Sequence, residues 1–179
     1  MCAALLTSCA EGSKVVVHPR RKNLTLGISS VTAAQLSAET ERENARLSWS
    51  SSDPDVATVD GQGFVTAVGY GVTRVTAAEP EGGGRGVCTV KVYTLPQSIT
   101  LRGSDKALRA GRKLSLQARL EPGAHIQKQH RSLTWSSSDS DVAIVDSFGR
   151  VTAVGAGVCD ITAVTVNGLE ATRTVEVTD

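Results

Sequence analysis

A segment of 29 residues occurs twice in this chain, and this repeat constrains the possible folds more than any other feature of the sequence. The first copy starts at Trp49 and the second at Trp135, and 20 of the 29 aligned positions are identical without a gap. The offset of 86 residues is too long for a solenoid repeat and long enough for each copy to enclose a core of its own. The sequence therefore predicts two tandem copies of one small domain, and a duplicated unit of this kind is usually a spacer or a binding module rather than an enzyme.

The composition indicates which kind of domain is repeated. Only 3% of the residues are aromatic and there is a single Met, while Val, Thr, Ser, Ala and Gly dominate. Such a composition is typical of short strands joined by tight turns. We therefore expect an all-β fold of two tandem sandwiches, each made of two sheets. We place a tail at residues 1–13, the first domain at 14–94 and the second at 95–179.

Alternation with a period of two assigns the faces of the strands within the repeated block. Thr73, Val75 and Ala77 face inward on one strand, and the same alternation predicts that Trp49 and Trp135 are buried between the two sheets of their own domains.

The segments between the strands are expected to be loops and turns. Residues 39–46 and 121–131 are interpreted as connecting loops, and 79–86 as a flexible hairpin tip. The Asn167-Gly168 pair predicts a type I′ hairpin turn.

Four cysteines are present, but their positions argue against disulfides within the domains. Cys2 and Cys9 lie in the tail, whereas Cys88 and Cys159 stand at non-equivalent places in the two copies. A disulfide built into the repeated domain would appear at matching positions in both copies. Strand parity instead places Cys88 and Cys159 on the inner faces, so we expect two free, buried thiols and sandwiches without inter-sheet disulfides.

Charged residues are evenly divided along the chain, whose formal net charge is +1. Residues 14–94 contain nine basic and eight acidic side chains, and residues 95–179 contain ten and nine. Neither domain has the excess of positive charge that nucleic acids or anionic membranes attract. We therefore expect no nucleic-acid partner, and we expect a monomer.

The tail contains the one candidate modification site. Leu6-Thr7-Ser8-Cys9 resembles the lipobox of bacterial lipoproteins, in which a leucine and two small residues precede the cysteine that is acylated. A complete signal peptide also has a basic start and an apolar stretch of about 7–15 residues, and here only Ala3–Leu6 is apolar. Two interpretations remain: a truncated lipoprotein signal with lipidation at Cys9, or a short tail. No other segment is apolar enough to span a membrane, so a lipid anchor is the one expected membrane contact.

No arrangement of residues in the sequence is typical of a catalytic site. His18, His125 and His130 have no acid or nucleophile at a suitable spacing, so we expect a protein that is not an enzyme.

Acidic residues recur in the loops of both copies and could bind calcium, although aspartates at such positions more often cap turns. Calcium is the one cofactor considered, and its candidate ligands are Asp53, Asp55, Asp60, Asp139, Asp141 and Asp146.

The two copies carry a specific family signature. WSSSDPDVATVD and WSSSDSDVAIVD are each followed by G-x-V-T-A-V-G-x-G and an alternating strand. This pattern resembles the bacterial immunoglobulin-like domain group 2 (BIG2) family over about residues 14–179. The resemblance implies an immunoglobulin-like sandwich that lacks the inter-sheet disulfide. Domains of this family occur as tandem arrays in bacterial surface proteins, beside catalytic domains in secreted polysaccharide enzymes, and in phage tail proteins, so the resemblance implies one of these settings.

Two classes of function follow from this resemblance. The first is a non-catalytic stalk or adhesin of the bacterial cell surface, lipid-anchored or otherwise secreted, that presents or binds an extracellular protein or glycan. Its candidate ligand-binding residues are Lys128, His130 and Arg131, which lie in the longer loop of the second copy. The second class is a structural component of an assembly, such as a phage tail or an envelope complex.

Overall fold

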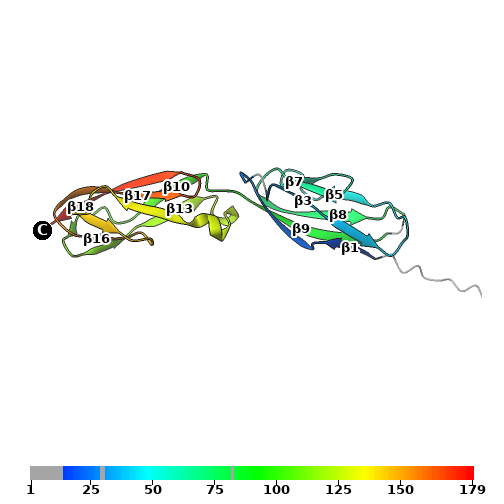
Figure 1. Ribbon diagram of the computed structural model, residues 1–179, viewed down its shortest axis with the longest axis horizontal. Helices are drawn as coiled ribbons and strands as arrows, with labels where there is room; N and C mark the ends of the chain where they lie inside the picture. Colours follow the sequence, from blue (N-terminus) through cyan, green and yellow to red (C-terminus); the bar gives the residue numbers. More distant parts are fainter. Residues whose placement is uncertain (1–13, 29–30, 82) are drawn as a thin grey trace, which may run out of the picture. The chain divides into compact units, whose positions relative to one another are not determined.

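The chain divides into two units, each with its own sheets. The computed structural model describes residues 14–28, 31–81 and 83–179 (Figure 1). Unit 1 comprises Met1–Tyr93 and unit 2 comprises Thr94–Asp179. Thr94 belongs to unit 2 because its N–H donates to the carbonyl of His125 at 2.8 Å and its backbone pairs with Ile126. The described parts of both units consist of strands and short 3₁₀ turns, so the all-β prediction is confirmed.

Unit 1 is a sandwich of two layers. In one layer β9 lies between β2, to which it is parallel, and β8, which pairs with β5 on its other side. In the other layer β7 lies between β3 and β6, and β1 pairs with β4, the strand that follows β3 after a single residue. The strands are β1 (Val15–His18), β2 (Arg21–Thr25), β3 (Ala33–Gln35), β4 (Ser37–Thr40), β5 (Ser48–Ser51), β6 (Ala57–Val59), β7 (Phe64–Ala67), β8 (Gly71–Ala78) and β9 (Arg85–Tyr93).

Unit 2 repeats this topology. The sheet order β11-β18-β17-β14 matches β2-β9-β8-β5, and β12-β16-β15 matches β3-β7-β6. β10 pairs with β13 as β1 pairs with β4. The strands are β10 (Ser98–Arg102), β11 (Leu108–Arg109), β12 (Lys113–Ser115), β13 (Gln117–Glu121), β14 (Leu133–Ser137), β15 (Ala143–Val145), β16 (Arg150–Ala153), β17 (Gly157–Thr165) and β18 (Glu170–Thr178).

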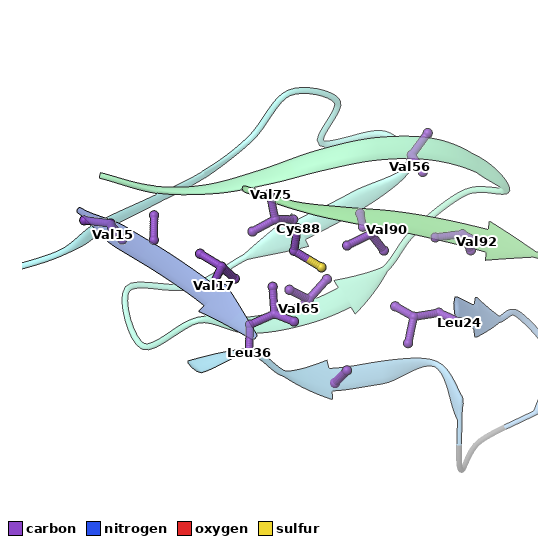
Figure 2. Packing of buried hydrophobic residues seen from close by; sticks show 13 residues of the cluster. Val15, Val17, Leu24, Leu36, Val56, Val65, Val75, Cys88, Val90 and Val92 are labelled. Carbon is purple, nitrogen blue, oxygen red and sulfur yellow. The ribbon is translucent and has the colours of Figure 1, made fainter. Parts of the chain in front are cut away.

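The inner faces of the strands form a separate apolar core in each unit. In unit 1 the core is built mainly from valines, with the Cys88 sulfur among them (Figure 2). In unit 2, Cys159 and Ile161 are buried on neighbouring inward positions of β17. Both cysteines are free and buried, as strand parity predicted. Burial raises the pKa of the Cys88 thiol, and the charge of Lys22 partly opposes this rise.

Trp49 and Trp135 do not lie as deep as the alternation suggested. Both are half-buried and pack against their cores. Each indole lies against a glycine of the turn that precedes β7 or β16, Gly63 or Gly149.

Several loop predictions were wrong in detail. Residues 39–46 begin inside β4, and residues 121–131 contain two short helices, η2 (Gly123–His125) and η3 (Lys128–Arg131). In the segment 79–86, Glu79 is only 4% exposed, and its carboxylate accepts a hydrogen bond from the Thr40 hydroxyl.

The hairpin after β17 is not a type I′ turn. Among the described residues only Asn44 has a positive φ without being glycine, so the positive φ of this turn falls on Gly168 alone. The Gly168 N–H donates to the Thr165 carbonyl at 3.0 Å, and the Thr165 N–H donates to the Leu169 carbonyl at 2.8 Å. This is the pattern of a longer loop that places glycine in the left-handed region.

Candidate functional site

Asp60 and Asp146 occupy equivalent turns, and each caps its turn. Asp60 Oδ1 accepts from the N–H groups of Gln62 and Phe64, both at 2.9 Å. Asp146 Oδ1 accepts from the N–H groups of Phe148 and Arg150 at 2.9 and 3.0 Å, and its Oδ2 lies 2.7 Å from Arg150 Nε. The pKa of Asp146 is lowered, chiefly by the Arg150 N–H, because these donors stabilise the ionised carboxylate.

The other candidate calcium ligands make similar local contacts. Asp53 Oδ1 accepts from the N–H of Asp55 at 3.2 Å, and Asp139 Oδ1 accepts from the N–H of Asp141 at 2.9 Å. Within residues 14–28, 31–81 and 83–179, no group of three or more His, Cys, Asp or Glu side chains is placed to hold a metal ion. Asp53, Asp60, Asp139 and Asp146 therefore cap turns in the structure, whereas calcium binding stays a prediction.

The serine runs before these turns also bond to the backbone of the turns. Ser51 Oγ accepts from the Asp53 N–H at 3.3 Å, and Ser137 Oγ lies 3.0 Å from the Asp139 carbonyl oxygen. These contacts give Ser51 and Ser137 a structural role at the end of their strands.

The candidate ligand-binding residues lie on η3 of unit 2. Lys128 and Arg131 are exposed, and His130 is half-buried. Arg131 is held by the loop itself, because its Nε donates to the Ile126 carbonyl at 3.1 Å and its guanidinium also donates to the Gly123 carbonyl. The loop therefore fixes Arg131 without a carboxylate partner among the described residues.

Arg131 lines an open depression of about 520 Å³ on unit 2. The half-buried ring of Trp135 and the ring of Phe148 also line it, together with Gln117, Ser132 and Ser147. Lys128 and His130 do not line it. Phe148 is 77% exposed, and its ring lies 5.5 Å from the Arg150 guanidinium carbon.

Phe148 was missed in the sequence. Its counterpart in unit 1 is Gln62, since both residues donate their N–H to the aspartate of the equivalent turn. The sequence did contain a signal, namely an aromatic residue at a turn position that is polar in the other copy. A ring exposed to this extent contributes little to the core.

The proposed lipidation site, Cys9, lies outside the described residues. Across the described ranges, no helix is long and apolar enough to cross a membrane.

Comparisons with known proteins agree with the duplicated sandwich. The family described as bacterial Ig-like domain (group 2) matches residues 22–90 and 97–175. An uncharacterised protein of Clostridium acetobutylicum is 34% identical over 126 residues, which cover 70% of this chain and 13% of that protein. The minor capsid protein of Enterobacteria phage T3 is 36% identical over 107 residues, which cover 58% of this chain and 22% of that protein. The chain thus spans less than a quarter of the length of either relative.

A solved structure shows the same kind of fold. Human protocadherin-24 EC1-2 superposes with a TM-score of 0.51 at 14% sequence identity, covering 93% of this chain and 97% of that one. At this identity the likeness concerns the fold alone. The two family matches together cover most of the sequence, and the chain therefore belongs to the bacterial Ig-like (group 2) domain family, with two domains in tandem.

Proposed function

We propose that this chain is a non-catalytic module of the bacterial cell surface, a stalk or adhesin that presents or binds an extracellular protein or glycan. The observation that carries this proposal is the depression on unit 2 beside Arg131 and Phe148. Aromatic rings and arginines are enriched in the centres of protein interfaces. The turn of unit 1 carries Gln62 instead of the phenylalanine, so the proposed binding role belongs to unit 2.

The loop of residues 121–131 supports this assignment. Arg131 is anchored through two backbone carbonyls, so less side-chain entropy is lost when it contacts a ligand. The rings of Phe148 and Trp135 present apolar area in the same depression. A fixed cation beside aromatic area suits a ligand that is partly acidic and partly apolar.

Binding to extracellular-matrix proteins and to an array of glycans tests this role. Phe148→Ala and Arg131→Ala are each expected to weaken the bound ligand at least tenfold, as hot-spot residues do on truncation. Gln62→Ala is the matched control at the equivalent turn of unit 1 and is expected to leave binding unchanged. Equal binding by all three variants, or no binding by the wild type, would contradict a ligand site in this depression.

The anchoring part of the proposal concerns Cys9, whose acylation would tether the chain to the membrane. Expression with the native upstream DNA in a bacterial host, followed by detergent partitioning and mass spectrometry of the N-terminal peptide, tests it. An acyl mass on Cys9 is expected, and Cys9→Ser is expected to move the protein to the aqueous phase. If Cys9→Ser partitions like the wild type, the anchored form of the proposal fails.

A second candidate function is a structural component of an assembly, such as a phage particle or an envelope complex. The likeness to the minor capsid protein of phage T3 favours it. Under this alternative Cys9 is not acylated and the protein co-sediments with particles, so the partitioning experiment separates the two candidates.

A further inference from the structure

The outward faces of the two equivalent four-stranded sheets carry opposite charge. In unit 1, β2, β5, β8 and β9 contain five Lys and Arg residues and no Asp or Glu, and four of the five face outward, since Lys22 is aligned with the buried Val90. In unit 2 the equivalent strands β11, β14, β17 and β18 contain three acidic residues, Asp160, Glu170 and Glu176. The even charge count along the sequence conceals this difference between the two sheets.

The register shows that the charge is reversed position by position. Arg74 and Asp160 each stand three residues after the glycine that opens the strand, Gly71 or Gly157. Two further cations correspond to acids through their strand partners: Lys91 pairs with Val72 as Glu176 pairs with Val158, and Arg85 pairs with Ala78 as Glu170 pairs with Val164. Three basic positions of unit 1 are therefore acidic in unit 2.

All six side chains are exposed on the outer surfaces of their sheets. Along β8 and β17 these exposed positions alternate with inward positions, such as Val75 and Ile161, which are buried. On unit 2, a hydrogen bond of 2.7 Å from Thr174 Oγ1 to Asp160 Oδ1 confirms that these two side chains share the outer face. Among the described residues, none of the six charges is in an ion pair.

Two edge residues modify the balance slightly. Arg21 on β2 lies beside Thr89, the partner of Arg74, and adds a fourth cation to the face of unit 1. Arg109 at the end of β11 pairs with Thr178 and is the one cation on the outer face of the four-stranded sheet of unit 2 within its described strands. Arg173 is directed inward by its pairing with Ile161 and donates to the Gly103 carbonyl at 3.1 Å.

We infer that the basic face of unit 1 (Arg74, Arg85, Lys91) binds the acidic face of unit 2 (Asp160, Glu170, Glu176) on a second copy of this chain. The terminal charges of each face are six residues apart on one strand, Arg85 and Lys91 on β9 and Glu170 and Glu176 on β18. Both pairs are therefore separated by the same distance, about 20 Å. The terminal charges of the two faces can thus be paired in either strand direction.

Apolar area lies among the charges on both faces. Val72 is 56% exposed on unit 1 and its counterpart Val158 is 62% exposed on unit 2. An apolar contact bordered by complementary charges has the composition of a specific interface. Because the two faces differ, the contact is heterologous, and it either closes a reciprocal pair or continues as a chain of molecules.

Sedimentation velocity of the full chain over a range of concentrations tests this inference. We expect association at low salt that falls at least tenfold at high salt, because screening weakens contacts between exposed charges. The triple variant Arg74→Glu, Arg85→Glu, Lys91→Glu has two acidic faces, and the triple variant Asp160→Lys, Glu170→Lys, Glu176→Lys has two basic faces. Each is expected to be monomeric alone, and an equimolar mixture of the two is expected to associate.

Restored association in the mixture shows that both variants are folded and that the two faces bind each other. The control reverses three exposed cations elsewhere in unit 1, Lys14→Glu, Arg42→Glu and Arg46→Glu, and is expected to associate like the wild type. A wild type that is monomeric at every concentration and low salt, association that persists in both triple variants, or a mixture that stays monomeric would overturn the inference. Binding of an added polyanion by a chain that remains monomeric would overturn it as well.

Discussion

The indole of Trp49 packs over the α-carbon of Gly63, from the opposite sheet of the same sandwich. A Cβ at Gly63 would lie 2.8 Å from Trp49 Cζ2, and the same relationship joins Trp135 to Gly149 at 2.7 Å. Both glycines have positive φ, +82° and +76°. Each pair thus couples a tight turn to the most voluminous side chain at the edge of the core.

Replacement of either glycine is therefore expected to destabilise its own unit. Gly63→Ala should cost about 2–4 kcal/mol, because it combines left-handed backbone strain with a contact that the indole must relieve. Gly61→Ala, in the same turn with no neighbour within 4 Å, should change stability by less than about 0.5 kcal/mol. Urea unfolding followed by circular dichroism measures both variants, and equal losses would show that the Trp49 contact is unimportant.

Thr73 anchors the start of the turn after β5, and its loss is expected to weaken unit 1. Its buried Oγ1 lies 3.0 Å from Ser51 Oγ and accepts from the Asp53 N–H at 3.0 Å. Thr73→Val keeps the shape but removes these bonds, which should cost about 1–3 kcal/mol.

The equivalent position in unit 2 provides the control for this substitution. It is occupied by Cys159, which faces Val175 as Thr73 faces Val90. Cys159→Val removes no hydroxyl and should cost less than about 1.5 kcal/mol. Thermal unfolding compares the two variants, and a larger loss in Cys159→Val would contradict the role given to the Thr73 hydroxyl.

Cys88 is expected to make unit 1 sensitive to high pH. Burial raises the pKa of this thiol above its ordinary value of 9.0, so above about pH 9 the unfolded chain loses the thiol proton more readily than the folded unit does. The stability of unit 1 should be complete below pH 9 and fall as the pH rises toward the raised value. Urea unfolding of Cys88→Ala between pH 7 and 10 should show a smaller fall than the wild type, and equal falls would exclude Cys88 as the cause.

Asp146 is expected to make unit 2 sensitive to acid. Its pKa lies below the ordinary value of 3.8 because the N–H groups of Arg150 and Phe148 bond to the ionised form. The contribution to stability is present above pH 3.8 and is lost as the pH falls through the lowered pKa. Asp146→Asn should remove that part of the acid dependence, which acid unfolding of the two proteins measures. An unchanged acid profile would indicate that other carboxylates dominate.

The same cap predicts an effect on the exposed ring beside it. Asp146 receives the N–H of Phe148 and the side chain of Arg150, so Asp146→Ala should also loosen Phe148 and weaken any ligand bound in the depression. The measurement is ligand binding by Asp146→Ala compared with Asp60→Ala, which changes the equivalent turn of unit 1 and should leave binding intact.

The sequence alone determined the two domains, the inward faces of β8 and β17, and the burial of Cys88 and Cys159. These features depend on a gapless repeat and on alternation with a period of two, which are local properties of the chain. The turn aspartates were also found, because each bonds to a backbone N–H two to four residues ahead.

The tertiary structure alone decided where charges and exposed rings gather. Arg74 lies on β8 and Lys91 on β9, 17 residues apart in sequence, and only the antiparallel register brings them to one face. Arg131 and Phe148 likewise line the same depression, although they belong to different loops. A count of charges along the chain cannot reveal such surfaces, because strand pairing sorts the residues onto faces according to partners that are distant in sequence.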